Sequence, residues 1–170
     1  MNPVAVRFEE LSHPYSDEYP NTTLHAADLG RLPLDSVAGV RAMVLESIGP
    51  LQHAANVPFH DSQARRKAIL IRTGWDQYWG SPQYGAPGPS MHDGLVFRLI
   101  RAQVRILGTD FPLELAARQA LIEKDIIVVE QMRRLDSVPK SGFDLYVVPL
   151  RIAAATSGVV RAFGEVRSQQ

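Results

Sequence analysis

One carboxylate of the sequence stands where a catalytic acid or base is often found. Glu130 comes directly after the apolar run Ile126-Ile-Val-Val129, which has the length and composition of a buried strand. A carboxylate at the end of such a strand lies at the rim of the core or partly inside it, where loss of water would raise its pKa. A raised pKa suits a general acid or base. The alternative is a structural carboxylate that pairs with an arginine or with backbone N–H groups.

Two further side chains, His25 and Arg118, could share this chemistry. An imidazole exchanges protons near neutral pH, so His25 could act as a general base; otherwise it is a histidine of a surface loop. Arg118 could pair with Glu130 as a fixed positive charge, which would oppose a rise in the pKa of Glu130. It could then hold a substrate carboxylate or stabilise an enolate. Glu114 lies four residues earlier, however, and an exposed Glu–Arg pair on a helix would need no function. The remaining candidates have no spacing that makes a site, and we expect them at the surface: His53, His60 and His92.

An aromatic segment could supply the walls of a pocket. Residues 74–89 hold four Gly, three Pro and the side chains of Trp75, Tyr78, Trp79 and Tyr84. A loop of this length within a compact domain is either functional or disordered, and both tryptophans of the chain lie in it, so we expect an ordered loop that binds substrate. The alternative is that these rings only cap the core.

The elements that must position these residues follow from the hydrophobic pattern. Apolar runs predict strands and helical spacing predicts helices, with Ser90 as the N-cap of the first helix and Asp110 as a turn residue. Strands are expected at 4–8, 37–45, 67–72, 104–107, 126–129, 143–150 and 159–163, helices at 91–103 and 113–121, and irregular chain at 12–23 and 49–64. Strands and helices alternate only in the middle of the chain. We therefore predict one domain over residues 1–170, of mixed α/β or α+β class, around a single sheet.

Composition excludes several classes of protein. The 170 residues carry 18 Lys+Arg against 18 Asp+Glu, which argues against a nucleic-acid binder. The chain has no cysteine, which excludes disulfides, thiolate metal sites and a cysteine nucleophile. No apolar run approaches the ~20 residues of a membrane span, and residues 1–7 do not resemble a signal peptide, so we expect a cytoplasmic protein. Serine-nucleophile and nucleotide-binding motifs are absent from the sequence.

From residue 67 onward, five segments follow one another in a characteristic order: Ala68-Ile-Leu-Ile-Arg-Thr-Gly-Trp75, Val104-Arg-Ile-Leu-Gly-Thr-Asp110, Ile126-Ile-Val-Val-Glu130, Phe143-Asp-Leu-Tyr-Val-Val-Pro-Leu-Arg151 and Val160-Arg-Ala162. This series resembles a known cyclase family, which contains bacterial kynurenine formamidases and isatin hydrolases. Phe8-Glu-Glu-Leu-Ser-His13 looks like the family's opening strand. The resemblance implies a mixed-sheet, swivelling β/α/β cyclase-like domain with a shortened N-terminal region. It also implies a homodimer or higher homo-oligomer.

The sequence departs from the family where the family binds its metal. The motif His-x-Gly-Thr-His-x-Asp-x-Pro-x-His is missing, and His25 is the only histidine in the corresponding region. Arg118 stands where the family has a metal-linked histidine twelve residues before the glutamate that matches Glu130. One His and one Glu are too few ligands for zinc or manganese, so we expect no metal and no cofactor.

Three functions remain open. The first is a metal-independent biosynthetic cyclase that performs ring closure, dehydration or lyase-type chemistry on a small, partly apolar natural-product or amide-like compound. Its catalytic residues would be Glu130, His25 and Arg118. The second is a non-catalytic relative that binds a small molecule or a partner protein. The third is a metal-dependent amide hydrolase whose ligands lie elsewhere in the sequence.

Overall fold

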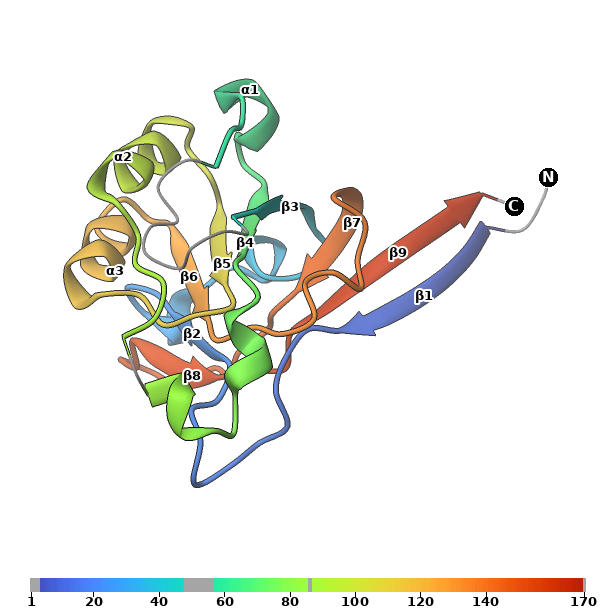
Figure 1. Cartoon of the computed structure of the whole chain (residues 1–170). Helices are drawn as coiled ribbons and strands as arrows, with labels where there is room; N and C mark the ends of the chain where they lie inside the picture. The colour runs from blue at the N-terminus through green and yellow to red at the C-terminus, as the bar shows by residue number, and fades with distance from the viewer. Residues whose placement is uncertain (1–3, 48–56, 86, 170) are drawn as a thin grey trace.

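A curled sheet of nine strands organises the chain. The computed structural model describes residues 4–47, 57–85 and 87–169 (Figure 1). The strand order is β1-β9-β7-β3-β4-β5-β6-β2-β8, and only the pairs within β3-β4-β5-β6 are parallel. The strands are β1 (Val4–Glu10), β2 (Thr23–His25), β3 (Val40–Glu46), β4 (Ala68–Arg72), β5 (Ile106–Thr109), β6 (Ile127–Glu130), β7 (Ser141–Tyr146), β8 (Ser157–Val159) and β9 (Phe163–Gln169).

Helices cover one face of the parallel strands (Figure 1). The helices are α1 (Asp61–Ala64), α2 (Asp93–Arg101) and α3 (Leu115–Ile122), and four 3₁₀ turns lie at Leu29–Arg31, Leu34–Ser36, Trp75–Tyr78 and Pro82–Gly85. Leu95 and Leu99 of α2 are buried together with Ile69 and Ile71 of β4 in one apolar cluster. This packing explains why β4 to β6 are apolar without alternation, because both faces of these strands are buried.

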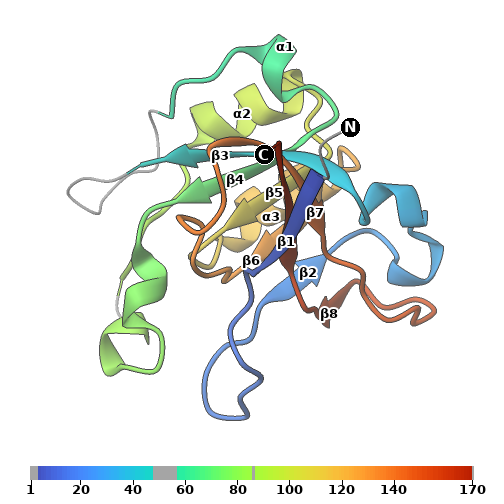
Figure 2. The ribbon, with the colours of Figure 1, turned by 90° about the vertical axis from the view of Figure 1, so that its right-hand side faces the viewer.

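The opposite face has its own core, which the curled part of the sheet covers. Phe143 and Leu145 of β7 are buried there with Leu70 of β4 and Val129 of β6. Beyond β7 the sheet continues as a long antiparallel ribbon of β1 and β9, which projects away from the helices in Figure 1 and points toward the viewer in Figure 2. The exposed ring of Phe8 lies on this ribbon.

Each helix enters its following strand through a non-glycine residue with positive φ. Arg66 after α1, Gln103 after α2 and Asp125 after α3 have φ values of 58°, 54° and 58°. A left-handed residue ends a helix sharply and turns the chain back onto the sheet. The three turns therefore lie together at the amino ends of β4, β5 and β6.

The predicted class, mixed α/β around one sheet, is confirmed, and several element boundaries are corrected. The N-cap of α2 is His92 and not Ser90. One strand is expected at 159–163, but in this segment the chain passes from β8 to β9. The two strands lie at different places in the sheet, because β8 pairs with β2 whereas β9 pairs with β7. The strand β2 begins at Thr23, the last residue of the segment expected to be irregular. His53 lies outside the described residues. No helix in the described ranges is long and apolar enough to cross a membrane.

Candidate active site

The site is built at the carboxyl end of β6, where Glu130 is almost completely buried. Its side chain is 2% exposed. The backbone N–H of Leu113, in the segment before α3, donates to Glu130 Oε1 at 3.2 Å. The apolar run before Glu130 places this carboxylate inside the core rather than at a wet rim.

Arg118 of α3 binds this carboxylate with two hydrogen bonds. Its Nε donates to Glu130 Oε1 at 2.7 Å, and its Nη2 donates to Glu130 Oε2 at 2.9 Å and to the carbonyl of Leu113 at 3.1 Å. The predicted pair between Arg118 and Glu114 is not formed; the guanidinium faces inward, and Glu114 accepts only the backbone N–H of Arg118. A bidentate Arg–carboxylate pair is among the strongest and most directional ion pairs in proteins.

His25 reaches the same carboxylate from β2. Thr23 pairs with Glu130 and His25 pairs with Val128 in the antiparallel register of β2 and β6. Residues two apart on a strand share a face, so His25 lies diagonally across from Glu130. The distance from His25 Nε2 to Glu130 Oε2 is 3.6 Å. The structure thus brings together the three side chains that the sequence singled out, and their catalytic role stays a prediction.

The electrostatics of Glu130 decide between two directions that the sequence left open. Burial alone would raise its pKa, but the contacts with His25 and Arg118 and the positive charge of Arg118 outweigh burial and hold it below 4.5. The pKa is lowered because Arg118 contacts the carboxylate directly. Glu130 is therefore a firmly ionised group at neutral pH and a weak general base.

In the aromatic loop, Trp75 packs into the core and Trp79 contacts the loop that follows β1. Trp75 is 2% exposed and packs against Tyr78 and Tyr84, with ring centroids 5.0 Å and 6.3 Å away. Trp79 stacks on His13 at 4.5 Å and donates its indole N–H to the carbonyl of Pro20 at 2.8 Å. Loops 11–22 and 73–85 therefore meet at the same end of the sheet, beyond the carboxyl ends of the parallel strands (Figures 1 and 2).

Tyr84 connects this loop electrostatically to the site. Its hydroxyl is buried without a hydrogen-bond partner among the described residues. Burial raises the pKa of Tyr84, and the negative charges of Asp110, Asp76 and Glu130 raise it further. The burial of Trp75 and Tyr84 supports the reading that they cap the core, whereas Tyr78 and Trp79 are only partly buried and keep surface available for a ligand.

Asp110 holds the start of the aromatic loop. Its carboxylate accepts hydrogen bonds from Thr73 N, Thr73 Oγ1 and Gly74 N at 2.7–3.0 Å. Gly74 has φ of 82°, a conformation that glycine adopts without strain. Burial raises the pKa of Asp110 to about 6 although these donors oppose the rise. Asp110 is thus a turn residue, as the sequence indicated, and it fixes the loop that carries Trp75.

His13 is a functional candidate that sequence reasoning missed. The residue is 9% exposed, and neither ring nitrogen has a hydrogen-bond partner among the described residues. Burial, together with the charge of Arg133, lowers the pKa of His13 to about 4, so the ring is neutral at pH 7. Its place in Leu-Ser-His at the end of the opening strand was the only available signal. In contrast, His60 and His92 are exposed as predicted.

The residues present do not fit a metal centre. Within the described parts of the chain, no group of three His, Asp or Glu side chains comes close enough to hold a metal ion. Both oxygens of Glu130 face the guanidinium of Arg118, which would repel a cation placed there. No step of the chemistry derived below passes through a metal.

Comparisons with known proteins show the fold. No family of known sequences and no curated protein sequence matches the chain. Isatin hydrolase A from Labrenzia aggregata, bound to benzyl benzoate, has a TM-score of 0.81 at 14% identity and covers 95% of this chain and 94% of its own. Isatin hydrolase A from Ralstonia solanacearum also has a TM-score of 0.81, at 12% identity, over 95% of this chain and 92% of its own. A potential metal-dependent hydrolase with cyclase activity has a TM-score of 0.76 at 14% identity, over 97% of this chain and all of its own. The cyclase-like fold expected from the sequence is thereby confirmed.

Proposed function

We propose that this protein is a metal-independent biosynthetic enzyme that closes a ring, with loss of water, in a small and partly apolar natural-product or amide-like compound. The observation that supports this function is the Arg118–Glu130 ion pair with His25 beside it. A fixed guanidinium stands where the resemblance implies a metal ligand. We further propose that the enzyme works in the cytoplasm and uses no cofactor.

His25 is the group that moves the proton. Its Nε2 faces Glu130, so this nitrogen carries the hydrogen and Nδ1 is the basic nitrogen. Glu130 fixes the orientation of the ring and stabilises the imidazolium that forms when Nδ1 takes a proton. Glu130 is in this scheme a positioning residue, which agrees with its low pKa.

Arg118 neutralises Glu130 and keeps one nitrogen for the substrate. Its Nε and Nη2 are engaged by Glu130 and Leu113, and Nη1 has no partner among the described residues. The side chain is 22% exposed. Nη1 can therefore donate to a substrate carbonyl and stabilise the oxyanion that develops there.

The reaction balances without any other reagent. His25 Nδ1 removes a proton from the attacking carbon or nitrogen of the substrate, which bonds to the carbonyl carbon held by Arg118. The imidazolium returns this proton to the oxyanion, which becomes a hydroxyl. His25 then removes a second hydrogen from the attacking atom, a double bond forms between that atom and the former carbonyl carbon, and the hydroxyl takes up this second proton from the imidazolium and leaves as one water. Tyr78 and Trp79 form the apolar wall against which such a substrate would be oriented.

The test uses a panel of linear aromatic amides and dicarbonyl compounds, with mass spectrometry to detect products that have lost one water. Turnover should persist with a metal chelator present. His25→Gln and Glu130→Gln should each lower the rate by at least ~100-fold, as is typical for loss of an acid–base group. His60→Gln, a substitution at an exposed histidine, is the matched control. Turnover that the chelator abolishes, or full activity in His25→Gln, would contradict the proposal.

The second candidate is a non-catalytic relative that binds a small molecule. The deep burial of Glu130 favours it, because a carboxylate that is 2% exposed and bonded through both oxygens can serve the fold alone. The same panel separates the two functions. A binder would show saturable ligand binding without any product, and Glu130→Gln would lower its stability rather than a rate.

A further inference from the structure

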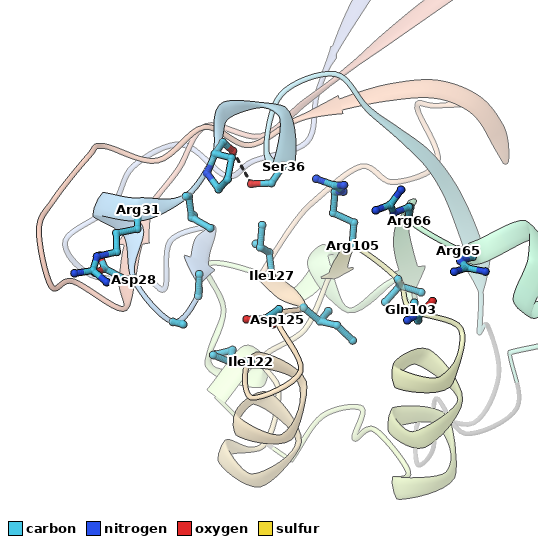
Figure 3. A pocket seen from close by; sticks show the side chains of 16 residues that line it. Asp28, Arg31, Ser36, Arg65, Arg66, Gln103, Arg105, Ile122, Asp125 and Ile127 are labelled. Carbon is cyan, nitrogen blue, oxygen red and sulfur yellow. Dashed lines mark hydrogen bonds and ion pairs between the residues drawn. The ribbon is translucent and has the colours of Figure 1, made fainter.

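A cavity of about 610 Å³ lies at the amino ends of the parallel strands, away from Glu130 (Figure 3). Ile127, the first residue of β6, lines it, whereas Glu130 ends the same strand. At 3.3 Å per residue these two positions are about 10 Å apart along the strand. The cavity is therefore distinct from the surroundings of the Glu130 carboxylate, although Ala26, the residue after His25, also lines it.

Arginines dominate the polar lining of this cavity. Arg65, Arg66 and Arg105 lie on one side of it, and Arg31 lies on the other side beside Asp28 (Figure 3). Arg31 is paired with Asp28 at 3.5 Å. None of the three clustered guanidiniums has a hydrogen bond or an ion pair with any residue that the structure describes. Most other arginines of the chain do have carboxylate or carbonyl partners, as Arg72, Arg98 and Arg118 show.

The fold places Arg66 and Arg105 in neighbouring turns at one side of the cavity. Arg66 has positive φ and lies in the turn between α1 and β4. Arg105 directly precedes β5, in the neighbouring turn between α2 and β5. The backbone of Arg105 donates to the carbonyl of Lys67, which keeps the two turns side by side. Like charges held close without counter-charges repel each other, and a bound anion would remove that repulsion.

Most of the remaining lining is apolar. Leu32, Pro33, Val104, Ile122, Ile126 and Ile127 contribute to the floor and walls. The volume falls within the 300–1,000 Å³ typical of small-molecule sites, which are mostly apolar with a few placed polar groups. Asp125 also lines the cavity, so four arginines stand against two aspartates.

We propose that this cavity binds a small organic dianion with an apolar body, such as a phosphate monoester or an aromatic dicarboxylate. The arginine cluster of Arg65, Arg66 and Arg105 holds the anionic group, and the isoleucines contact the body. Guanidinium groups suit both anions, because phosphate and carboxylate oxygens each accept paired N–H donors.

Titration with phenyl phosphate and with phthalate tests the proposal. We expect saturable binding of at least one of them, with Kd of about 1 mM or lower, weakened by added salt. Inorganic phosphate should bind at least tenfold more weakly, because it cannot use the apolar floor. The double variant Arg66→Gln/Arg105→Gln should weaken binding at least tenfold. The control is Arg101→Gln, which also removes one arginine charge. Arg101 does not line the cavity and pairs with Asp61, so this variant should leave binding unchanged.

A second measurement guards against a misfolded variant. In the unaltered protein, the ligand should shift the backbone NMR signals of Gln103, Asp125 and Ile127 and leave those of Thr23 and Glu130 in place. Absence of saturation by both probes, an equal loss in Arg101→Gln, or shifts centred on Glu130 would overturn the proposal.

Discussion

Replacement of Arg118 by Met should destabilise the protein strongly at neutral pH. Met keeps the length of the side chain but removes the guanidinium, so Glu130 stays buried with only Leu113 N and His25 as partners. Loss of one partner of a buried ion pair costs about 3–5 kcal/mol. Arg118 is 22% exposed, so solvent screens part of the interaction and we expect a loss of roughly 2–3 kcal/mol.

The pH dependence of this loss has a definite sign. In the unaltered protein the pKa of Glu130 lies below 4.5, so its contribution is present above that pH and is lost as pH falls through the lowered value. Without Arg118, burial prevails and the pKa of folded Glu130 rises above 4.5. The folded variant then takes up a proton more readily than the unfolded chain, and its stability increases as pH falls toward 4.5.

Urea denaturation at pH 7 and pH 5 measures both effects. The stability gap between the two proteins should shrink at pH 5. Arg101→Met is the control, because its pair with Asp61 is exposed on both sides and should contribute at most about 1 kcal/mol. A loss below about 1 kcal/mol in Arg118→Met, equal at both pH values, would refute the reasoning that Glu130 is desolvated and needs its partner.

Further consequences can be checked in the same preparations. His13→Phe keeps a ring stacked on Trp79 and removes two buried nitrogens without partners, so the variant should lose less stability than His13→Ala, as measured by denaturation. The pKa of about 4 for His13 means that stability should fall between pH 6.5 and 4, and His13→Phe should flatten this fall; an unchanged pH profile would speak against burial of the ring. Purified protein exposed to zinc and then dialysed should hold far less than one equivalent by elemental analysis. Light scattering should report a dimer, and a monomer at micromolar concentration would count against the resemblance-based expectation.

The central elements could be predicted from the sequence because their signals are local. The apolar runs of β4 and β6 and the helical spacing of α2 each lie within one short segment. The contact of Arg118 with Glu130 was also foreseeable, since α3 turns directly into β6. These features depend on residues close together in the chain, which a periodic pattern can reveal.

The features that were missed depend on distant packing. A three-residue strand such as β2 has no periodicity, and it exists because β6 and β8 supply its hydrogen bonds. The burial of His13 depends on Trp79, which comes from a loop more than sixty positions away in the sequence. The direction of the Glu130 pKa likewise required the distance to Arg118. Sequence alone named the residues but could not rank burial against ion pairing.

The insertion of β2 between β6 and β8 sets the order in which the protein can mature during synthesis. β2 emerges from the ribosome before its partners, which are residues 128–130 and 157–159, more than one hundred positions later in the sequence. The segment that holds His25 therefore has no strand partner while the helices and the first parallel strands form from local contacts. Long-range strand pairing is the slow part of folding. The imidazole consequently reaches Glu130 only after β6 has been made and has paired with β2, so a nascent chain that ends before β6 has no completed site.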